Sequence, residues 1–158
     1  MKMAEHDRSH NYLGIEIREP LVVEANRLAK EAGLTNLHYE FSNALLSLDK
    51  SLSGIPEGIL QTVTIQFPDP WFKKKHAKRR MVTPSMASAV VSHLAPGGLL
   101  FVQTDIDFLA EEMFEVFNQF DELKEEATDV NPFPFKTERE AAVEEKLLPV
   151  YRRGFVKR

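Results

Sequence analysis

Two kinds of segment alternate along this chain, and their order limits the folds that it can adopt. Short runs rich in apolar and β-branched residues are each followed by a longer stretch in which apolar residues recur at helical spacing. This order is typical of an α/β fold, in which βα units build a mostly parallel sheet covered by helices. The predicted strands are residues 12–17, 37–41, 60–67, 99–103, 123–128 and 150–156, and the predicted helices are residues 20–32, 44–48, 84–94, 108–120 and one that begins at residue 137.

Local signals set several of these boundaries. Thr83 followed by Pro84 combines an N-cap side chain with a proline at the first helical position. Thr137 and Glu140 have the spacing of a capping box, which predicts another helix start. The Pro-Gly-Gly sequence at residues 96–98 predicts a turn into the next strand.

Composition excludes several classes of protein. A chain of 158 residues that is 43% hydrophobic can bury the core of one domain, so we expect a single domain over residues 1–158. The absence of cysteine excludes disulfides, thiolate metal sites and cysteine nucleophiles, and we expect no metal site. No apolar run approaches the roughly 20 residues that a membrane span needs, and residues 1–11 do not resemble a secretory signal.

The charge is unevenly distributed, although the net charge is only −4. Ten of the 20 Lys and Arg lie in two short stretches without acids, and the rest of the chain carries ten bases against 24 acids. A basic surface on an acidic body suits a phosphate-bearing polyanion, but a solvated loop and a charged tail would have the same composition. The two stretches contain Lys73, Lys74, Lys75, Lys78, Arg79 and Arg80, and then Arg152, Arg153, Lys157 and Arg158.

Polar residues follow several predicted strands, where ligands of open α/β sheets bind. Glu16, at the end of the first strand, could accept both ribose hydroxyls of a nucleoside cofactor, or it could simply be an acid at a helix start. Asn43, after the second strand, could contact an adenine edge, or it could serve as a helix cap.

The sequence Phe-Pro-Asp-Pro-Trp at residues 67–71 is the most distinctive motif. Two prolines hold Asp69 in a stiff turn directly after a buried strand, which would aim its carboxylate at a bound base. Trp71 and Phe72 could belong to the core or could offer a surface on which a base stacks. His76, within the basic stretch, could act as a general base but is more typical of a phosphate contact.

Asp105 follows the next strand of the sheet, and we therefore expect it near Asp69. Two carboxylates at adjacent strand ends could accept the N1 and N2 protons of guanine. That contact would direct the guanine N7 toward a methyl donor.

These segments together resemble the tRNA (guanine-N7)-methyltransferases. The Pro-Asp-Pro-Trp core with its basic tail is highly specific, whereas Gly-Ile-Glu at residues 14–16 is weak alone. The resemblance covers nearly the whole chain in family order, through residues 11–16, 67–80, 104–105, 137–140 and 148–152.

The resemblance implies a Rossmann-like class I fold, S-adenosylmethionine as cofactor and tRNA as substrate. It implies that Glu16 with Ile17 contacts the cofactor ribose, that Asn43 with Ala44 contacts adenine, and that Asp69 lies at the methyl-transfer site against the cofactor. It implies that the target guanosine is bound by Lys73, Asp105, Thr137, Glu138, Arg139 and Glu140. It further implies that tRNA is contacted by Lys74, Lys75, His76, Lys78, Arg79 and Arg80.

One family feature is missing from the sequence. The family opens with a strand and a glycine-rich loop that wraps the cofactor, but the first glycine here is Gly14. Residues 3–6 resemble the end of the helix that would follow that loop. We therefore expect an N-terminally truncated methyltransferase domain in which the missing strand would be central, between those of residues 12–17 and 60–67.

Two other functions are compatible with parts of the sequence. An inactive truncated form or a noncatalytic RNA-binding module would fit the missing loop, whereas a dinucleotide-dependent oxidoreductase is disfavoured because no Gly-x-Gly-x-x-Gly motif occurs. We expect tRNA and no membrane as partners, with a homo-oligomer or an accessory subunit both compatible. The cytoplasm is the expected compartment, and an organelle is also compatible.

Overall fold

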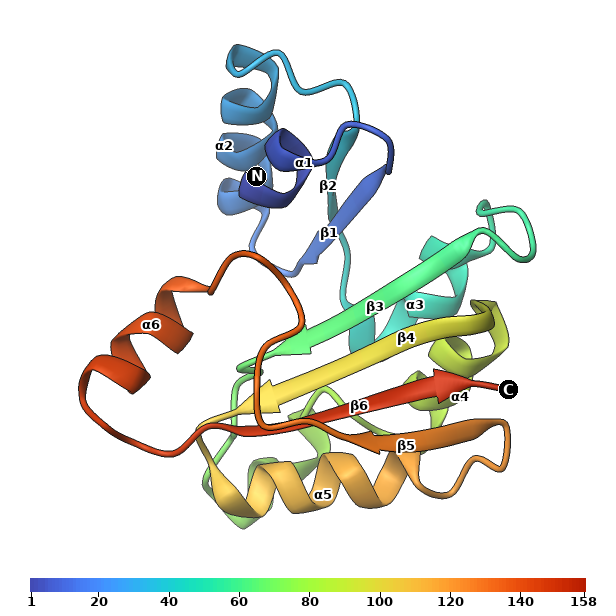
Figure 1. Ribbon diagram of the computed structural model, residues 1–158, viewed down its shortest axis with the longest axis vertical. Helices are drawn as coiled ribbons and strands as arrows, with labels where there is room; N and C mark the ends of the chain where they lie inside the picture. The colour runs from blue at the N-terminus through green and yellow to red at the C-terminus, as the bar shows by residue number, and fades with distance from the viewer. The chain divides into compact units, whose positions relative to one another are not determined.

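The computed structural model describes residues 1–158 apart from the side chain of Ala127. Its elements fall into two compact units, Met1–Ser47 and Leu48–Arg158, which are described separately (Figure 1). The boundary falls inside α3 (Ala44–Leu52), where Ser47 has the non-helical dihedrals φ −138° and ψ 15°.

The first unit is a βαβ arrangement. Strands β1 (Tyr12–Glu16) and β2 (Leu37–Phe41) pair in parallel, and α2 (Glu19–Glu31) connects them. The amide of Asn26 on α2 donates to the Tyr39 carbonyl at 2.7 Å and accepts from the Tyr39 N–H at 2.8 Å. These two bonds tie the helix to β2. Gly14 is needed in β1 because a Cβ there would lie 2.4 Å from the Tyr39 ring.

The N-terminal helix α1 (Lys2–His6) packs into this unit, as the helical character of residues 3–6 predicts. Ala4, Ala29 and Leu34 form a small buried cluster with Tyr12 and Leu37 at its border. The cluster is small because several large apolar side chains of the unit are exposed, among them Leu13, Ile17, Leu21, Val23 and Phe41. Much of its stability therefore rests on backbone pairing and on side-chain hydrogen bonds to the backbone.

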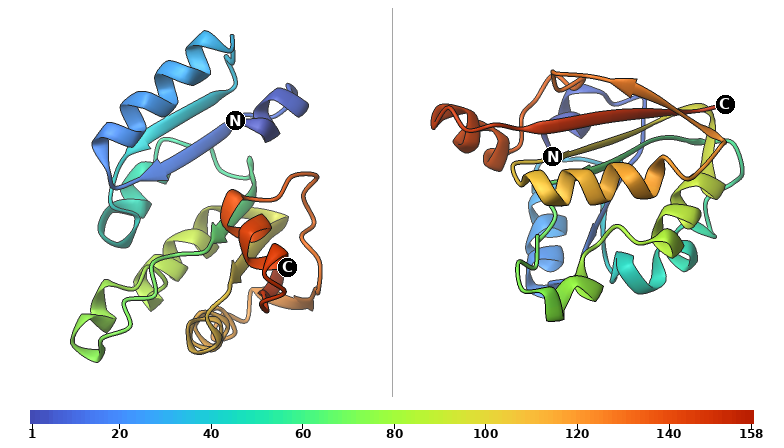
Figure 2. Two further views of the ribbon diagram at one scale, coloured as in Figure 1. Left: turned by 90° about the vertical axis from the view of Figure 1, so that its left-hand side faces the viewer. Right: turned by 90° about the horizontal axis from the view of Figure 1, so that it is seen from below.

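The second unit contains a four-stranded sheet with the strand order β3–β4–β6–β5. β3 (Leu60–Gln66) and β4 (Leu94–Thr104) are parallel, whereas β6 (Tyr151–Lys157) is antiparallel to both β4 and β5 (Leu123–Ala127). Helix α5 (Asp107–Phe117) runs along one face of β4 and β6 and contacts α4 (Pro84–His93) (Figures 1 and 2).

The core of the second unit covers both faces of its sheet: α5 packs on the face of Phe155, and Phe101 points to the opposite face. Phe117 of α5 and Phe155 of β6 are both fully buried, with ring centroids 5.6 Å apart. Phe101 of β4 is also fully buried and meets Phe133 edge to face at 5.6 Å. Each buried aromatic ring removes a large apolar area from water, so both ring pairs stabilise the unit.

Two segments differ from the sequence expectation. The predicted turn at residues 96–98 lies within β4, where the pairing with β3 shifts register between Leu60 and Thr62. Gly97 has φ +76°, which a residue with a side chain rarely adopts, so glycine lets the strand bend here without ending. The first basic stretch, for which the sequence predicts neither helix nor strand, forms a 3₁₀ helix, η1 (Lys74–Arg79).

The last helix, α6 (Glu138–Glu145), begins as predicted. The Thr137 hydroxyl accepts from the Glu140 N–H at 3.1 Å, and the Glu140 carboxylate accepts from the Thr137 N–H at 3.4 Å. This capping box fixes the first turn of α6 at the end of the sheet where β3 and β4 terminate. Among the described residues, no helix combines the length and the apolar character needed to cross a bilayer.

We expect Thr83→Ala to lower the free energy of unfolding by about 1 kcal/mol. The Thr83 hydroxyl accepts from the Met86 N–H at 3.2 Å at the start of α4, and alanine leaves that donor without a side-chain partner. Urea unfolding followed by circular dichroism measures the change. Thr83→Ser keeps the hydroxyl and should restore most of the stability; equal losses in both variants would contradict a capping role.

Candidate active site at the strand ends

A cavity of about 530 Å³ lies where β3 and β4 end in the second unit. Parallel pairing puts Gln66 opposite Gln103, so the segments that follow these two residues emerge side by side. The cavity receives Asp69 from one segment and Asp105 from the other, together with Thr137 and Arg139 from the start of α6. Its lining consists of Gln66, Phe67, Pro68, Asp69, Pro70, Phe72, Asp105, Ile106, Thr137 and Arg139.

The turn that carries Asp69 has an unusual backbone. Phe67 and Trp71, on either side of the Pro-Asp-Pro sequence, both lie in the left-handed region with φ of +50° and +42°. Such conformations are costly for residues with side chains and persist only where surrounding contacts hold them. Asp69 is exposed, and its Oδ1 accepts from the Trp71 N–H at 3.1 Å. The carboxylate is thus held in a defined turn and remains open to solvent.

Asp105 shares the cavity with Asp69, as predicted, but it already has a partner. Its side chain is only 12% exposed and forms an ion pair with Arg139. Arg139 is 59% exposed, so its guanidinium can turn toward solvent. A ligand with N–H donors could replace this cation on the Asp105 carboxylate.

Glu140 was expected to bind the substrate, and the structure places it differently. Its side chain is fully buried and does not line the cavity. The carboxylate accepts from Arg152 at 2.9 Å, from Asn131 at 2.8 Å and from Gln103 at 3.2 Å, besides accepting from the Thr137 N–H at the start of α6. Glu140 therefore anchors the start of α6 to the sheet, because a buried carboxylate needs this set of donors.

The partners of Glu140 extend this buried network. Arg152, 9% exposed, also donates to Glu144 at 2.7 Å and to the Gln103 side chain at 3.1 Å. Lys136, together with Arg152, holds the pKa of the Glu144 carboxyl below its usual value. Gln103 in turn donates to Gln66, which lines the cavity, at 2.8 Å. Sequence reasoning missed both glutamines, although their position as the last polar residues of adjacent strands was the available signal.

Most of the first basic stretch is exposed, as an anion-binding surface requires. Among the described residues, no acidic side chain forms an ion pair with its exposed cations. Two side chains of this stretch pack against the Trp71 ring: the Arg79 guanidinium lies 5.0 Å from its centre, and His76 meets it edge-on at 5.5 Å. The exposed cations are Lys73, Lys74, Lys75, Lys78 and Arg79, whereas Arg80 is only 12% exposed.

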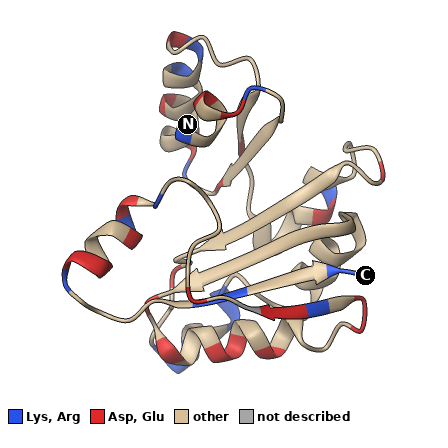
Figure 3. Cartoon of the chain, viewed as in Figure 1, with Lys and Arg blue, Asp and Glu red and all other residues tan. Residues whose placement is uncertain are grey.

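The second basic stretch does not form another open basic surface. Arg152 is buried, and Arg153 lies 4.7 Å above the Phe114 ring and 3.3 Å from Glu125. Lys157 donates to the carbonyls of Val91 and Leu94, each at 2.7 Å. These cations hold β6 to its neighbours, while acidic residues lie along α5 and α6 (Figure 3).

In the first unit, the predicted cofactor residues follow β1 and β2. Both Glu16 oxygens accept from the Arg18 guanidinium at 3.0 Å, and this interaction lowers the pKa of the Glu16 carboxyl. Asn43 accepts from the Leu45 N–H at 3.1 Å at the start of α3, which is the cap role that the sequence left open. Ile17 is exposed, and Ala44 is half-buried.

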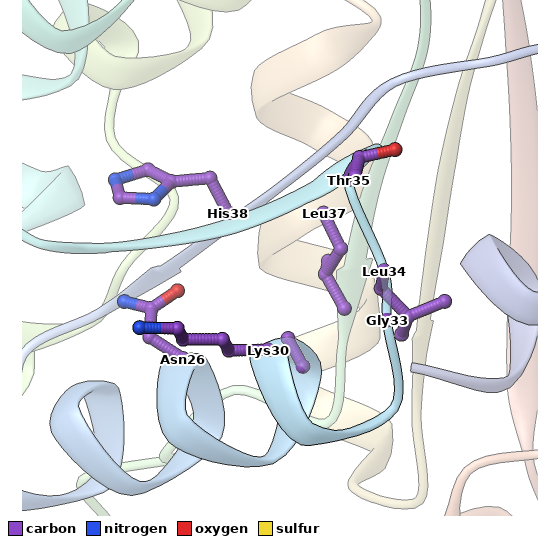
Figure 4. Close-up of a pocket in the computed structure, with 8 residues that line it drawn as sticks. Asn26, Lys30, Gly33, Leu34, Thr35, Leu37 and His38 are labelled. Carbon is purple, nitrogen blue, oxygen red and sulfur yellow. The ribbon is translucent and has the colours of Figure 1, made fainter.

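The first unit also has a hollow of about 420 Å³ beside α2 and β2 (Figure 4). Lys30 and His38 lie at its border, and the Asn26 amide beside them is already bonded to the Tyr39 backbone. None of the predicted site residues lines it. Among the described residues there is also no group of three or more His, Asp or Glu that could hold a metal ion.

Comparisons with known proteins identify the family. A family model described as "putative methyltransferase" matches residues 1–153. The chain is 48% identical over 159 residues to a tRNA (guanine-N(7)-)-methyltransferase of Trichormus variabilis, with 98% of this chain and 74% of the relative covered. It is 49% identical over 160 residues to the protein of the same name from Synechococcus elongatus, with 99% and 75% covered.

Solved structures support the fold assignment. The aminoglycoside resistance methyltransferase NpmB1 superimposes with a TM-score of 0.61 at 18% identity, covering 99% of this chain and 80% of that one. The N-methyltransferase NodS of Bradyrhizobium japonicum, in complex with S-adenosyl-L-homocysteine, also has a TM-score of 0.61, at 13% identity and with 99% and 70% covered. The chain thus has the α/β fold of class I methyltransferases, and with its high identity to the cyanobacterial proteins it belongs to the tRNA (guanine-N(7)-)-methyltransferase family.

Proposed function

We propose that this chain transfers a methyl group from S-adenosylmethionine to N7 of a guanosine in tRNA, with Asp69 as the catalytic residue. The observation that carries the residue assignment is the shared cavity of Asp69 and Asp105 in a unit that also presents an exposed basic segment. We further propose that the chain acts as one methyltransferase domain, since the family match runs through both of its units. The proposed compartment is the cytoplasm.

The reaction asks little proton chemistry of the protein. Guanine N7 has a lone pair and no proton, so no general base is needed to make it a nucleophile. Nearby carboxylates stabilise the positive charge that develops on the purine. The rate enhancement comes from this stabilisation and from the alignment of N7 with the methyl group. Asp69, held by its rigid turn, suits both tasks.

Guanine recognition is assigned to the remaining polar groups of the cavity. Asp105 would accept N–H donors of the guanine edge in exchange for those of Arg139, which is exposed enough to turn away. Thr137 and Arg139 line the same cavity and would contact the nucleoside beside Asp105. Lys73 and Glu138 do not line the cavity, so their role as substrate contacts stays a prediction from the family resemblance.

The cofactor would be held by residues of the first unit. When bound, S-adenosylmethionine supplies the methyl group on a positively charged sulfur. Glu16 with Ile17 would bind the ribose, since its two oxygens already accept a forked pair of donors from Arg18, as two adjacent hydroxyls also require. Asn43 with Ala44 would contact the adenine.

The tRNA backbone is assigned to the exposed cations of η1 and of the residues just before it. Lys74, Lys75, Lys78 and Arg79 are free of acidic partners in the described part of the chain, so their charge is available to phosphates. His76 lies among them, packed against Trp71.

The function is tested by incubating the chain with tRNA and S-adenosylmethionine and measuring 7-methylguanosine by mass spectrometry of the digested tRNA. We expect Asp69→Asn to lower turnover on the order of 10²-fold while tRNA affinity is retained, because the carboxylate charge is lost at the reacting base. Asp121→Asn removes an exposed acid outside the cavity and serves as the control. Unchanged turnover in Asp69→Asn would remove Asp69 from its role. A chain that binds tRNA without methylating it, even when extended at its N-terminus, would indicate an RNA-binding module.

The exposed cations of the first basic stretch can be tested separately. Replacing Lys75, Lys78 and Arg79 by alanine should weaken tRNA binding and reduce the slope of log affinity against log salt by about 1 for each lost phosphate contact. Filter binding at several salt concentrations measures both quantities. The same charge change made at the exposed Lys30, Lys50 and Lys146 should leave the slope unchanged, and equal effects of the two sets would argue for net charge alone.

The pKa of Glu16 tests the pairing of this residue with Arg18. The Arg18 guanidinium lowers the pKa of this carboxyl by stabilising its charged form, so Arg18→Ala should raise the pKa toward the ordinary glutamate value. An NMR pH titration of the Glu16 carboxyl carbon measures it. Arg8→Ala removes another exposed arginine, one that donates to the Gly33 carbonyl, and should not move this pKa. A Glu16 pKa that stays low in Arg18→Ala would exclude the Arg18 guanidinium as its cause.

A further inference from the structure

Arg80 differs from every other cation of the first basic stretch. Its side chain is 12% exposed, whereas the neighbouring Arg79 is exposed. Its guanidinium donates from Nε to the Pro70 carbonyl at 3.0 Å and from Nη2 to the Trp71 carbonyl at 3.3 Å. These carbonyls belong to the two residues that follow Asp69. Arg80 therefore holds the backbone of the turn that presents the catalytic carboxylate.

The opposite side of the same guanidinium is fixed to α5. Nη1 of Arg80 donates to the Glu112 carboxylate, with 2.7 Å to Oε2, and the guanidinium carbon lies 4.9 Å from the centre of the Phe108 ring. Phe72, which lines the cavity, packs edge-on against the same Phe108 at 6.0 Å. Arg80 and Phe72 thus attach both ends of the segment after Asp69 to one helix.

This attachment links the turn of Asp69 to the helix that follows Asp105. Helix α5 begins at Asp107, only two residues after Asp105, so its first turns move together with Asp105. The Asp69 turn has left-handed residues at Phe67 and Trp71 and needs outside contacts to keep that conformation. Arg80 supplies such contacts to the turn and is itself held by α5, the helix that follows Asp105.

We propose that Arg80 is a positioning residue that clamps the Asp69 turn to α5 and so sets the placement of Asp69 relative to Asp105. The proposal builds on the function proposed above, in which both carboxylates face the target guanine. Lysine could not replace arginine here, because one ammonium cannot reach two carbonyls and a carboxylate with the planar fork of a guanidinium. A phosphate contact by Arg80 would require these bonds to break.

Trp71 is the only tryptophan of the chain, so its fluorescence reports directly on the clamped turn. We expect Arg80→Lys to shift the Trp71 emission to the red and to increase its quenching by acrylamide. We also expect kcat to fall at least tenfold, while the dissociation constant for tRNA and its salt dependence stay within twofold of the unaltered chain. Circular dichroism establishes that the variant is folded.

Arg153→Lys is the matched control. Arg153 also stacks on a phenylalanine of α5, Phe114, and pairs with a carboxylate, Glu125, but neither of these contacts involves the Asp69 turn. Its replacement should leave Trp71 emission and kcat unchanged. Glu112→Gln is a milder second variant, which keeps Arg80 and weakens only its ion pair with α5. We expect it to shift Trp71 emission and lower kcat in the same direction as Arg80→Lys, but by less.

The outcomes separate the clamp from the alternatives. Unchanged Trp71 emission together with weaker tRNA binding and a reduced salt slope in Arg80→Lys would overturn the proposal and make Arg80 a phosphate contact. If Arg153→Lys changed Trp71 emission and kcat as much as Arg80→Lys, the effect of Arg80 would be general packing of α5, and the clamp proposal would be wrong. Because the fluorescence measurement needs neither cofactor nor tRNA, a chain without methyltransferase activity would refute the proposed function, and the Trp71 emission would still decide whether the clamp exists.

Discussion

The parallel pairing of β3 with β4 is the constraint on which the candidate site depends. Their register sets Gln66 opposite Gln103, so the Asp69 turn and Asp105 leave the sheet side by side and line one cavity. A slip by one residue would turn the side chains of β3 to the opposite face of the sheet and separate the two carboxylates. Buried aromatic rings on both faces of the sheet stabilise this register. Phe117 and Phe155 fill the space between the sheet and α5, whereas Phe101 packs against Phe133 on the opposite face.

Cations that look alike in sequence have three different roles in the second unit. Those of η1 are exposed and available to an anion, whereas Arg152 neutralises two glutamates and Lys157 caps the carbonyls at the end of α4. Arg80 holds backbone carbonyls of the Asp69 turn. Composition could therefore indicate a polyanion-binding protein but could not say which cations bind, since availability depends on burial and on partners distant in sequence.

The start of α6 shows how a local signal and a distant one combine. The capping box of Thr137 and Glu140 was readable from spacing alone, because its hydrogen bonds join residues three apart. The burial of Glu140 was not readable, since its remaining donors come from Asn131, Gln103 and Arg152. The family motif thus contains both cavity residues, such as Thr137 and Arg139, and a residue behind them that holds the helix start in place.

The sequence by itself determined the α/β order of elements, the helix starts at Thr83 and Thr137, and the acid between two prolines as the centre of interest. These features depend on residues close together in the chain, whose propensities and caps act locally. Only the tertiary structure decided that Arg139 forms an ion pair with Asp105, that Arg152 pairs with the buried Glu140, and that Arg80 holds the Asp69 turn. Those contacts join residues brought together by strand pairing and helix packing, and a charged side chain carries no local signal of which partner it will meet.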